Sequence, residues 1–445
     1  MGIEGNQKAW IVAVDMGYGH QRAANPLRGL SPTGKVITAN NYKGIPKKDY
    51  RIWHESEFLY SLISRLSNLP LLGKYIFNAY DKLQSIEDFY PRRDMSRSNA
   101  QVRQIYALIK RGWGKDLIDY LGTEDIPLIT SFFVTAFMAE EHGFKNEIYC
   151  IICDADISRA WVAKNPQKSR IKYFAPCRRV VERLKLYGVK EQNIFLTGFP
   201  LPLENIGGSN LKVLKTDLAE RIHNLDPEKR YHQKYQHTIS AFLKDANKDD
   251  AIEHPLTLTF AVGGAGAQKK LARNILYSLR KKLLKQDLNL NLIAGTRNDV
   301  YVYFRDEISR AGLTKMLGNN IKIIFAVEKE DYFDEFNQVL RTTDIFWTKP
   351  SELVFYSALG VPIIIAPSIG SQEVFNRTWL KTINAGISQN NPKYTHEWLF
   401  DWVDSGWLAE AAMAGFLDGR QFGVDNIIDV VFNGVKEPHK SYQLL

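Results

Sequence analysis

Two series of short apolar segments, each alternating with helical patterns, constrain the fold of this 445-residue chain most strongly. The first series begins at residues 9–14 and the second at residues 256–262, and in both cases the first apolar segment runs directly into glycines. Short apolar strands that alternate with helices are typical of parallel sheets covered by helices on both faces. Because a chain of this length exceeds what one hydrophobic core usually serves, we expect two α/β domains, each a doubly wound parallel sheet.

The apolar segments also indicate where the domains begin and end. In the first half we predict strands over residues 9–14, 35–38, 126–130, 148–153, 171–174 and 194–197, with a helix over 178–187. In the second half we predict strands over residues 256–262, 290–294, 321–325, 344–347 and 362–366, with a helix over 269–284. Residues 204–255 are rich in charged and amide side chains, which indicates a linker with a helical insert. We therefore expect domains over residues 1–203 and 256–420, and a segment over 421–445 that packs back on the first domain.

The charge balance favours anionic partners. The chain carries 58 Lys and Arg against 49 Asp and Glu, a net charge of +9 at pH 7, which suits nucleotides, lipid headgroups or nucleic acid. No RNA-binding signature, zinc-finger spacing or basic tail occurs in the sequence, so we expect no nucleic-acid partner. No apolar run approaches the roughly 20 residues of a membrane span, and residues 1–8 lack the apolar core of a signal peptide. We therefore expect a cytoplasmic location.

The three cysteines are too few for a disulfide framework, which agrees with a reducing compartment. Cys150 and Cys153 form a C-x-x-C pair, but they lie in a predicted buried strand and no second pair supplies further zinc ligands. Asp154 and Asp156 have the spacing of an Asp-x-Asp metal motif. We interpret neither pattern as a redox or metal site.

Glycine turns after the first strand of each half are the strongest site candidates. The first contains Gly17, Gly19 and His20, and the second contains Gly263, Gly264, Ala265 and Gly266. Backbone N–H groups at such a turn, together with the start of the following helix, bind anionic groups. Ligands of parallel sheets bind at the carboxyl ends of the strands, so two domains that face each other place both turns on one cleft.

Several segments together resemble the monogalactosyldiacylglycerol synthase-like glycosyltransferases, relatives of the bacterial enzyme that adds N-acetylglucosamine to the lipid-linked peptidoglycan precursor. In the first half the similar segments are residues 17–24, 153–161, 174–176, 181–189 and 197–200. In the second half they are residues 263–267, 344–350, 358–364 and 370–376. The resemblance implies the GT-B fold, in which two Rossmann-like domains face each other across a cleft.

The resemblance also implies a function. A sugar would pass from a nucleotide-sugar donor, a UDP-sugar, held by the second domain to a lipid or membrane-linked acceptor held by the first. The implied catalytic residues are His20 and Asp154, since an imidazole or a carboxylate can take the proton of the attacking hydroxyl. The implied donor-binding residues are Gly263, Gly264, Ala265, Gly266, Lys349, Ser351, Glu352, Gln372, Glu373 and Asn376. No metal or other cofactor is expected, because glycine-loop amides can carry the charge of the leaving phosphate.

Individual donor residues have separate expected roles. Ser351 either caps a helix that begins at Glu352 or approaches a phosphate. Gln372 and Glu373 offer hydrogen bonds to sugar hydroxyls, and Asn376 lies one helical turn later, where it can orient them.

Two departures from the family pattern leave the activity open. Relatives carry a glutamate that grips the ribose hydroxyls where this chain has Phe355, and Glu352 is the expected substitute on the same helical face. Ser351 replaces the usual glycine. A nucleotide-sugar-binding protein without catalysis is therefore one alternative, and a nucleotide-sugar epimerase or hydrolase is another, because the same architecture hosts both.

Residues 51–112 combine aromatic and basic side chains in a helical pattern. We expect this segment to handle the acceptor and to lie on an anionic bilayer, as a peripheral membrane surface on the inner face of the membrane. The alternative is an ordinary pair of helices packed on the first sheet.

Overall fold

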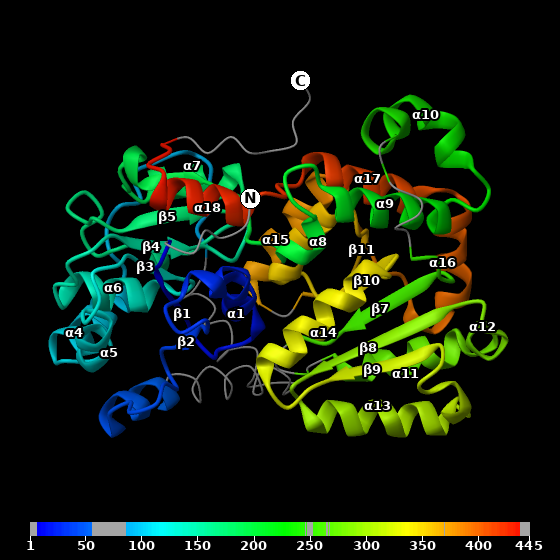
Figure 1. Cartoon of the computed structure of the whole chain (residues 1–445), viewed down its shortest axis with the longest axis horizontal. Coiled ribbons are helices and arrows are strands. Elements are labelled where there is room, and N and C mark those ends of the chain that lie inside the picture. Colours follow the sequence, from blue (N-terminus) through cyan, green and yellow to red (C-terminus); the bar gives the residue numbers. More distant parts are fainter. Residues whose placement is uncertain are drawn as a thin grey trace.

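The computed structural model describes residues 7–55, 86–244, 252–263, 268–368 and 370–436, together with Ala246 and Gly266. Each half of the chain forms a parallel sheet of six strands (Figure 1). The first sheet has the order β2 (Ile37–Thr38), β1 (Trp10–Ala13), β3 (Leu128–Thr130), β4 (Ile148–Ile151), β5 (Lys172–Ala175) and β6 (Ile194–Leu196). The second has the order β12 (Gly386–Ser388), β11 (Ile363–Ile365), β10 (Ile345–Thr348), β7 (Thr257–Ala261), β8 (Asn289–Gly295) and β9 (Ile321–Phe325).

Helices connect the strands of both sheets. The first domain contains α1 (Tyr18–Ala24), η1 (Asn25–Leu30), a helix over residues 47–55, α4 (Ala100–Lys110), α5 (Lys115–Leu121), α6 (Phe133–Glu141), η2 (Arg159–Trp161), α7 (Arg178–Leu186) and η3 (Glu191–Asn193). The crossing into the second domain contains α8 (Leu203–Ile206), α9 (Lys212–Leu225) and α10 (Arg230–Leu243).

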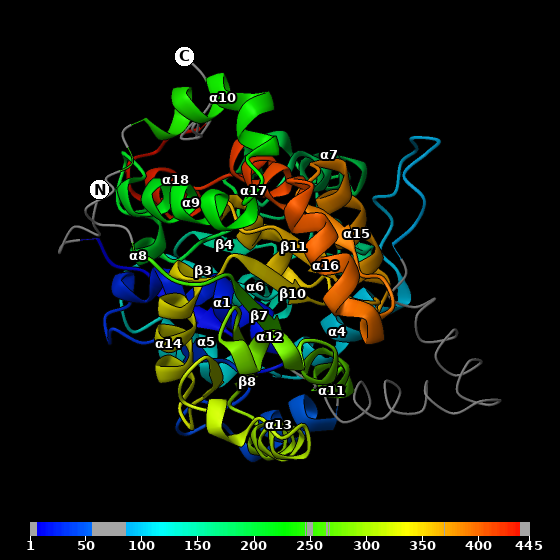
Figure 2. The same ribbon diagram turned by 90° about the vertical axis from the view of Figure 1, so that its right-hand side faces the viewer.

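The second domain is covered in the same way. It contains α11 (Lys269–Ser278), α12 (Arg280–Lys285), α13 (Asn298–Arg310), η5 (Thr314–Met316), α14 (Lys329–Arg341), η6 (Glu352–Leu359), α15 (Ser371–Thr382), η7 (Pro392–Tyr394), α16 (Thr395–Asp404) and α17 (Trp407–Asp418). The last helix of the described chain is α18 (Gly423–Phe432). In Figures 1 and 2, α9 and α17 lie above the second sheet and α11 and α13 lie below it. Helices on both faces of two parallel sheets confirm the predicted fold class, the GT-B type of architecture.

The strands form where the sequence has continuous apolar runs because both faces of each sheet are covered. All residues of β1 and β7, for example, are buried, as is typical of parallel sheets. One helix prediction was wrong. The helix predicted over residues 269–284 is interrupted at Leu279, between α11 and α12. Helix α1 begins at Tyr18, so that His20 lies in its first turn.

The segment 204–255, expected to be a linker with a helical insert, contributes α9 to the second domain. Leu214, Leu218 and Ile222 are buried and recur every four residues along one face of α9. Buried Arg221 donates hydrogen bonds to four backbone carbonyls, at Thr343 (2.7 Å), Leu359 (3.0 Å), Gly360 (3.2 Å) and Leu340 (3.3 Å). These bonds tie α9 firmly to the second sheet's amino edge.

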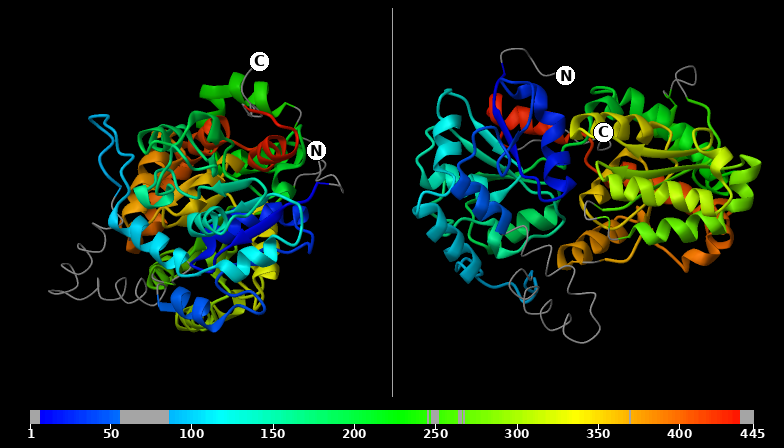
Figure 3. Two further views of the ribbon diagram at one scale, coloured as in Figure 1. Left: turned by 90° about the vertical axis from the view of Figure 1, so that its left-hand side faces the viewer. Right: turned by 90° about the horizontal axis from the view of Figure 1, so that it is seen from below.

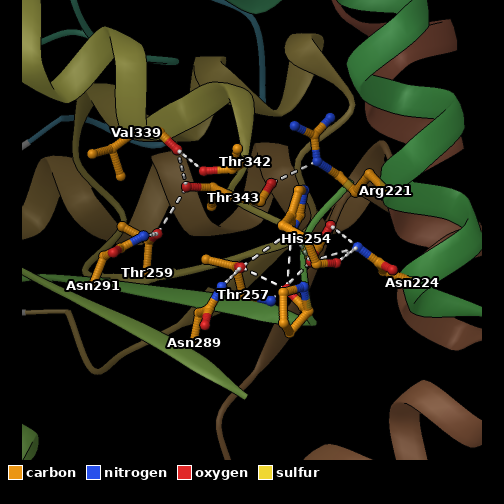
Figure 4. Close-up of polar contacts among 12 residues, drawn as sticks. Arg221, Asn224, His254, Thr257, Thr259, Asn289, Asn291, Val339, Thr342 and Thr343 are labelled. Carbon is orange, nitrogen blue, oxygen red and sulfur yellow. Dashed lines mark hydrogen bonds and ion pairs between the residues drawn. The ribbon is translucent and has the colours of Figure 1, made fainter. Parts of the chain in front are cut away.

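Polar side chains fill that amino edge between α9 and the strands (Figure 4). Asp344 accepts hydrogen bonds from the backbone of Thr257 (2.8 Å) and from Asn224 of α9 (3.2 Å). Thr259 bonds to Thr343 at 2.8 Å. The cluster lies at the opposite end of the strands from the glycine turns, and we interpret it as structural.

The chain returns to the first domain at its C-terminal end. In Figure 1, α18 lies among the elements of the first domain, and Asn426 Nδ2 donates to the Thr197 carbonyl at 2.8 Å. Seen from below in Figure 3, the two domains lie side by side with α18 and α1 near their junction. The domains therefore touch through their facing edges and are joined by two crossings of the chain.

Candidate active site

Each sheet has one topological switch point, where the order in which the chain adds strands reverses. In the first sheet this point lies between β1 and β3, and in the second between β7 and β10. Helices leave these strand pairs toward opposite faces of the sheet, which opens a crevice at the carboxyl ends where ligands of such folds bind. The predicted glycine turns stand at these two points, since Gly17 follows β1 and Gly263 follows β7.

His20 occupies the first of these crevices. Its Nδ1 lies 2.7 Å from the carbonyl oxygen of Ser131, the residue after β3. A carbonyl can only accept, so Nδ1 carries the proton and Nε2 of the neutral ring is left as an acceptor. Burial lowers the pKa of His20, which favours the neutral form. The ring packs against Phe132 and Trp161, with centroid distances of 4.9 and 6.0 Å. His20 is therefore a neutral, oriented proton acceptor.

Glycine is needed at both positions of the first turn, for two different structural reasons. Gly17 precedes α1 with φ +107°, a conformation that other residues rarely adopt. A Cβ at Gly19 would lie 3.0 Å from Glu352 Oε2 of the second domain. Gly19 thus permits the close approach of the two domains.

Asp154 follows β4 and meets the second domain directly. Asn376 of α15 donates from Nδ2 to Asp154 Oδ1 at 2.9 Å and accepts at Oδ1 from the Ala155 backbone at 2.7 Å. Burial, together with the charges of Glu352 and Glu373, raises the pKa of Asp154 to about 6, against the opposing effects of the hydrogen bond from Asn376 and the charge of Lys349. The structure therefore brings together Asp154, Asn376 and Glu373, all of which the sequence indicated.

His20 and Asp154 do not form a hydrogen-bonded pair in the described part of the chain. Instead, the Sγ of Cys153 lies 3.7 Å from His20 Nδ1. The neighbouring carboxylate, Asp156, is held by Arg183 at 2.8 Å and by Arg179 at 2.8 Å and belongs to the interior of the first domain. The described residues contain no cluster of three or more His, Cys, Asp or Glu side chains suited to a metal.

Lys349 follows β10 and lies against the second glycine turn. Its Nζ forms an ion pair with Glu373 Oε1 at 2.5 Å. A Cβ at Gly263 would lie 2.1 Å from Lys349 Cε, so only glycine leaves room for the lysine there. Gly266 has φ +66°. Gly264 and Ala265 lie outside the described residues, and Gln372 lies beside Glu373 in the first turn of α15 with its amide oxygen near Gly370.

The structure corrects the predicted capping role of Ser351 and gives a second expected donor residue, Glu352, a partner in the first domain. Ser351 precedes η6, but its side chain makes no capping hydrogen bond, so it is not a cap. Glu352, expected to replace the ribose-binding glutamate, is paired through Oε1 with Arg22 Nη1 at 2.6 Å. Phe355 does not take that place either, because its ring stacks on Phe199 at 5.2 Å.

The sequence analysis missed two residues of α1 that reach the second domain. Tyr18 accepts a hydrogen bond from the Thr296 backbone at 2.8 Å and covers Gly295, where a Cβ would lie 2.4 Å from its hydroxyl. The Arg22 guanidinium lies over the Phe336 ring at 4.8 Å from the centroid and donates to Tyr332. Their spacing of four residues on a helix was the available signal, because it puts both on one face.

The segment 51–112 is only partly described. Trp53 is buried, with its ring 4.7 Å from that of Trp113, so this aromatic residue belongs to the core. The expected membrane-facing side chains between residues 56 and 85 lie outside the described residues. Among the described helices, none combines the length and apolar character needed to cross a bilayer.

Comparison with known proteins gave one family and several similar folds. Residues 236–393 match a family described as a domain of unknown function, DUF6938. No curated protein matched the chain.

The solved structures are similar at low sequence identity. The S. aureus MnaA–UDP co-structure has a TM-score of 0.45 and 12% identity, covering 84% of this chain and 90% of that one. A UDP-GlcNAc 2-epimerase from Neisseria meningitidis bound to UDP-GlcNAc has a TM-score of 0.42 and 10% identity, covering 81% and 89%. MurG from Acinetobacter baumannii has a TM-score of 0.43 and 14% identity, covering 80% and 88%.

Proposed function

We propose that this protein is a glycosyltransferase that moves a sugar from a UDP-sugar to a lipid or membrane-linked acceptor. The observation that carries the proposal is the bridge from Asp154 to Asn376, which sets a carboxylate of the first domain beside the Lys349–Glu373 pair of the second. A proton acceptor from one domain and a cation from the other thus meet where both sheets present their carboxyl ends. The resemblance of the sequence motifs supplies the nucleotide-sugar part of the proposal.

The donor would bind at the β7–β10 crevice. Its diphosphate needs cations and N–H groups, which Lys349 and the turn from Gly263 to Gly266 can provide. Lys349 would then exchange its present partner Glu373 for a phosphate oxygen. Glu373, released by this exchange, and Gln372 and Asn376 would hydrogen-bond the hydroxyls of the sugar.

The transfer itself needs one proton acceptor and a stabilised leaving group. The acceptor hydroxyl gives its proton to His20 Nε2 or to the Asp154 carboxylate while its oxygen bonds to the anomeric carbon. The bond from that carbon to the phosphate oxygen breaks, and UDP leaves with its charge balanced by Lys349 and the turn amides. Both candidate bases have pKa values suited to this role, since that of Asp154 is about 6 and burial keeps His20 neutral.

Donor binding is tested by thermal melting with UDP, GDP, CDP and their sugars, because a ligand that binds only the folded state raises the melting temperature. We expect UDP and UDP-sugars to give the largest shift, and the shift to be lost in Lys349→Met. If no nucleotide stabilises the protein at millimolar concentration, the donor site is wrong.

Turnover is tested with a radiolabelled UDP-sugar and a membrane lipid extract. We expect labelled lipid, and its loss in His20→Asn or in Asp154→Asn with donor binding retained. His237→Asn, on the exposed side of α10, is the matched control. UDP release without labelled lipid would favour a hydrolase, and a changed sugar would favour an epimerase. Donor binding with no reaction would favour a binding protein.

The lipid-linked acceptor and the cytoplasmic, peripheral membrane location remain parts of this proposal. Co-sedimentation with anionic vesicles at low and high salt tests them, because headgroup attraction is screened by salt. We expect the protein to sediment with the vesicles at low salt only. Failure to sediment would favour an acceptor that is not membrane-linked.

A further inference from the structure

We infer that a second site, separate from the proposed donor crevice, binds a small organic phosphate between the two domains. The site is a cavity of about 280 Å³ near the two chain crossings. Its walls include Arg178 and Phe199 of the first domain, Phe355 and Trp379 of the second, and Arg420 on the returning chain. The sequence motifs predict no ligand contact for any of these residues, and none of them takes part in the proposed reaction.

The two arginines give the cavity its charge. Among the described residues, no side chain or backbone group forms a hydrogen bond or an ion pair with the guanidinium of Arg178 or Arg420. Nη1 of Arg420 is buried and has no hydrogen-bond partner. Buried donors are almost always satisfied, and an unpaired buried charge is costly. The buried Nη1 of Arg420 and the exposed guanidinium of Arg178 are therefore both available to bind an anion in the cavity.

The charge of Arg420 is also destabilised by its surroundings in the cavity. Burial lowers its pKa, and the charge of Arg178 lowers it further, so two like charges share the cavity. The carboxylate lining the cavity is that of Asp418, an exposed residue that forms no ion pair with either arginine among the described residues. A phosphate group suits two convergent guanidinium groups because each can donate two parallel hydrogen bonds to its oxygens.

Backbone features hold the cationic wall in place. Arg420 packs on Gly198, which has φ +89° and where a Cβ would lie 2.6 Å from the arginine's own Cβ. Arg178 is the first residue of α7, so the positive end of this nine-residue helix faces the same cavity. Gly198 thus allows the backbone of Arg420 to pack closely at the cavity wall, and the end of α7 adds its positive charge to that of the two guanidinium groups.

The opposite wall is aromatic. Phe199 and Phe355 stack with their ring centroids 5.2 Å apart, and Phe355 packs on Trp379 at 4.9 Å. Trp379 is only half-buried, so its ring has surface left for a ligand. A planar or apolar group attached to the phosphate would pack there. This assigns a reason to Phe355, which replaces the family's ribose-binding glutamate.

The experiment is isothermal titration calorimetry of the full chain with phenyl phosphate, inorganic phosphate and phenol. We expect phenyl phosphate to bind more tightly than either fragment. Arg420→Gln and Arg178→Gln should each weaken its binding by about tenfold or more, as expected for loss of a charge-assisted hydrogen bond. Trp379→Ala should weaken the binding of phenyl phosphate but leave the binding of inorganic phosphate unchanged.

Two controls separate this site from the donor crevice. Lys349→Met should leave phenyl phosphate binding intact while it removes UDP binding, and Arg305→Gln, on exposed α13, should change neither. Arg178 is exposed, so its variant should fold even if that of Arg420 does not. The proposal is overturned if phenyl phosphate does not bind at millimolar concentration, if Arg178→Gln binds it normally, or if Lys349→Met abolishes its binding.

Discussion

Arg22 of the first domain and Glu352 of the second form a buried ion pair, with Nη1 and Oε1 2.6 Å apart and side-chain exposures of 4% and 9%. The arginine lies 330 residues before its partner and is enclosed by aromatic rings of both domains, including those of Tyr18 and Tyr332. The pair joins α1, the helix at the glycine turn of one domain, to η6, which follows β10 in the other. It thus fixes how the two proposed halves of the active site face each other.

Arg22→Met should destabilise the protein by about 3–5 kcal/mol, because it leaves the Glu352 carboxylate buried without its partner. The measurement is the free energy of unfolding from urea denaturation. Adding Glu352→Leu should recover much of the loss, since no unpaired charge then remains.

The matched control is Arg28→Gln. Arg28 also crosses the domain boundary, to Asp334 at 3.0 Å, but these side chains are 37% and 49% exposed. Exposed pairs contribute about 1 kcal/mol or less. If the Arg22 and Arg28 variants lost equal free energies of unfolding, burial would not explain the strength of the Arg22–Glu352 pair.

Asp154→Asn should make the protein more stable at neutral pH. Burial raises the pKa of Asp154 from 3.8 to about 6 in the folded protein. Between these values the folded state binds more protons than the unfolded state, so wild-type stability falls as pH rises. The introduced asparagine side chain cannot ionise, so the variant does not lose stability in this way. Its free energy of unfolding should exceed that of the wild type by an amount that grows from pH 4 to pH 6 and then levels off at no more than about 3 kcal/mol.

Thermal melts between pH 4 and pH 8 measure this difference. Asp306→Asn, at an exposed position on α13, controls for the loss of one carboxylate. An advantage that is the same at every pH would show that Asp154 is ionised in both states across this range.

The fold was predictable because parallel strands covered on both faces leave continuous apolar runs, as at Thr257–Ala261. Strand β12 (Gly386–Ser388) was missed because it is three residues long, starts with glycine and is only partly buried. The stripe of Leu214, Leu218 and Ile222 on α9 was hidden by the charged residues between them.

The site was predictable only within each domain. Gly17, His20 and Lys349 stand where strand ends and glycine turns indicate them, since this depends on local sequence. The partners of Glu352 and Asp154 come from the opposite domain, at separations of 330 and 222 residues, and no local pattern encodes such contacts. Phe355 could be recognised as a departure, but not as a ring stacked on Phe199.

The three cysteines should resist alkylation in the folded protein. Cys150, Cys153 and Cys177 are buried and free, and burial raises the pKa of each thiol, to about 12 for Cys177. The reactive species is the thiolate, so little should react at pH 8. Mass spectrometry after iodoacetamide treatment should find no modification in native protein and three modified sites in urea. Modification of Cys150 or Cys153 in native protein would revive a redox role for the C-x-x-C pair.

Gly263→Ala should weaken UDP binding without unfolding the protein. The added Cβ would lie 2.1 Å from Lys349 Cε, and a flexible lysine moves more readily than the backbone of β7. Displacing Lys349 from the proposed phosphate position should raise the Kd of UDP by about tenfold or more, as expected for loss of a charge-assisted hydrogen bond.

A double variant tests whether Gly263 acts through Lys349. If both changes act through the same amine, the protein that carries Gly263→Ala and Lys349→Met should bind UDP no more weakly than the protein with Lys349→Met alone. Calorimetric titration of the four proteins completes this cycle, with Gly122→Ala after α5 as the control for an added methyl group. Additive losses would mean that Gly263 affects the donor by a route other than Lys349.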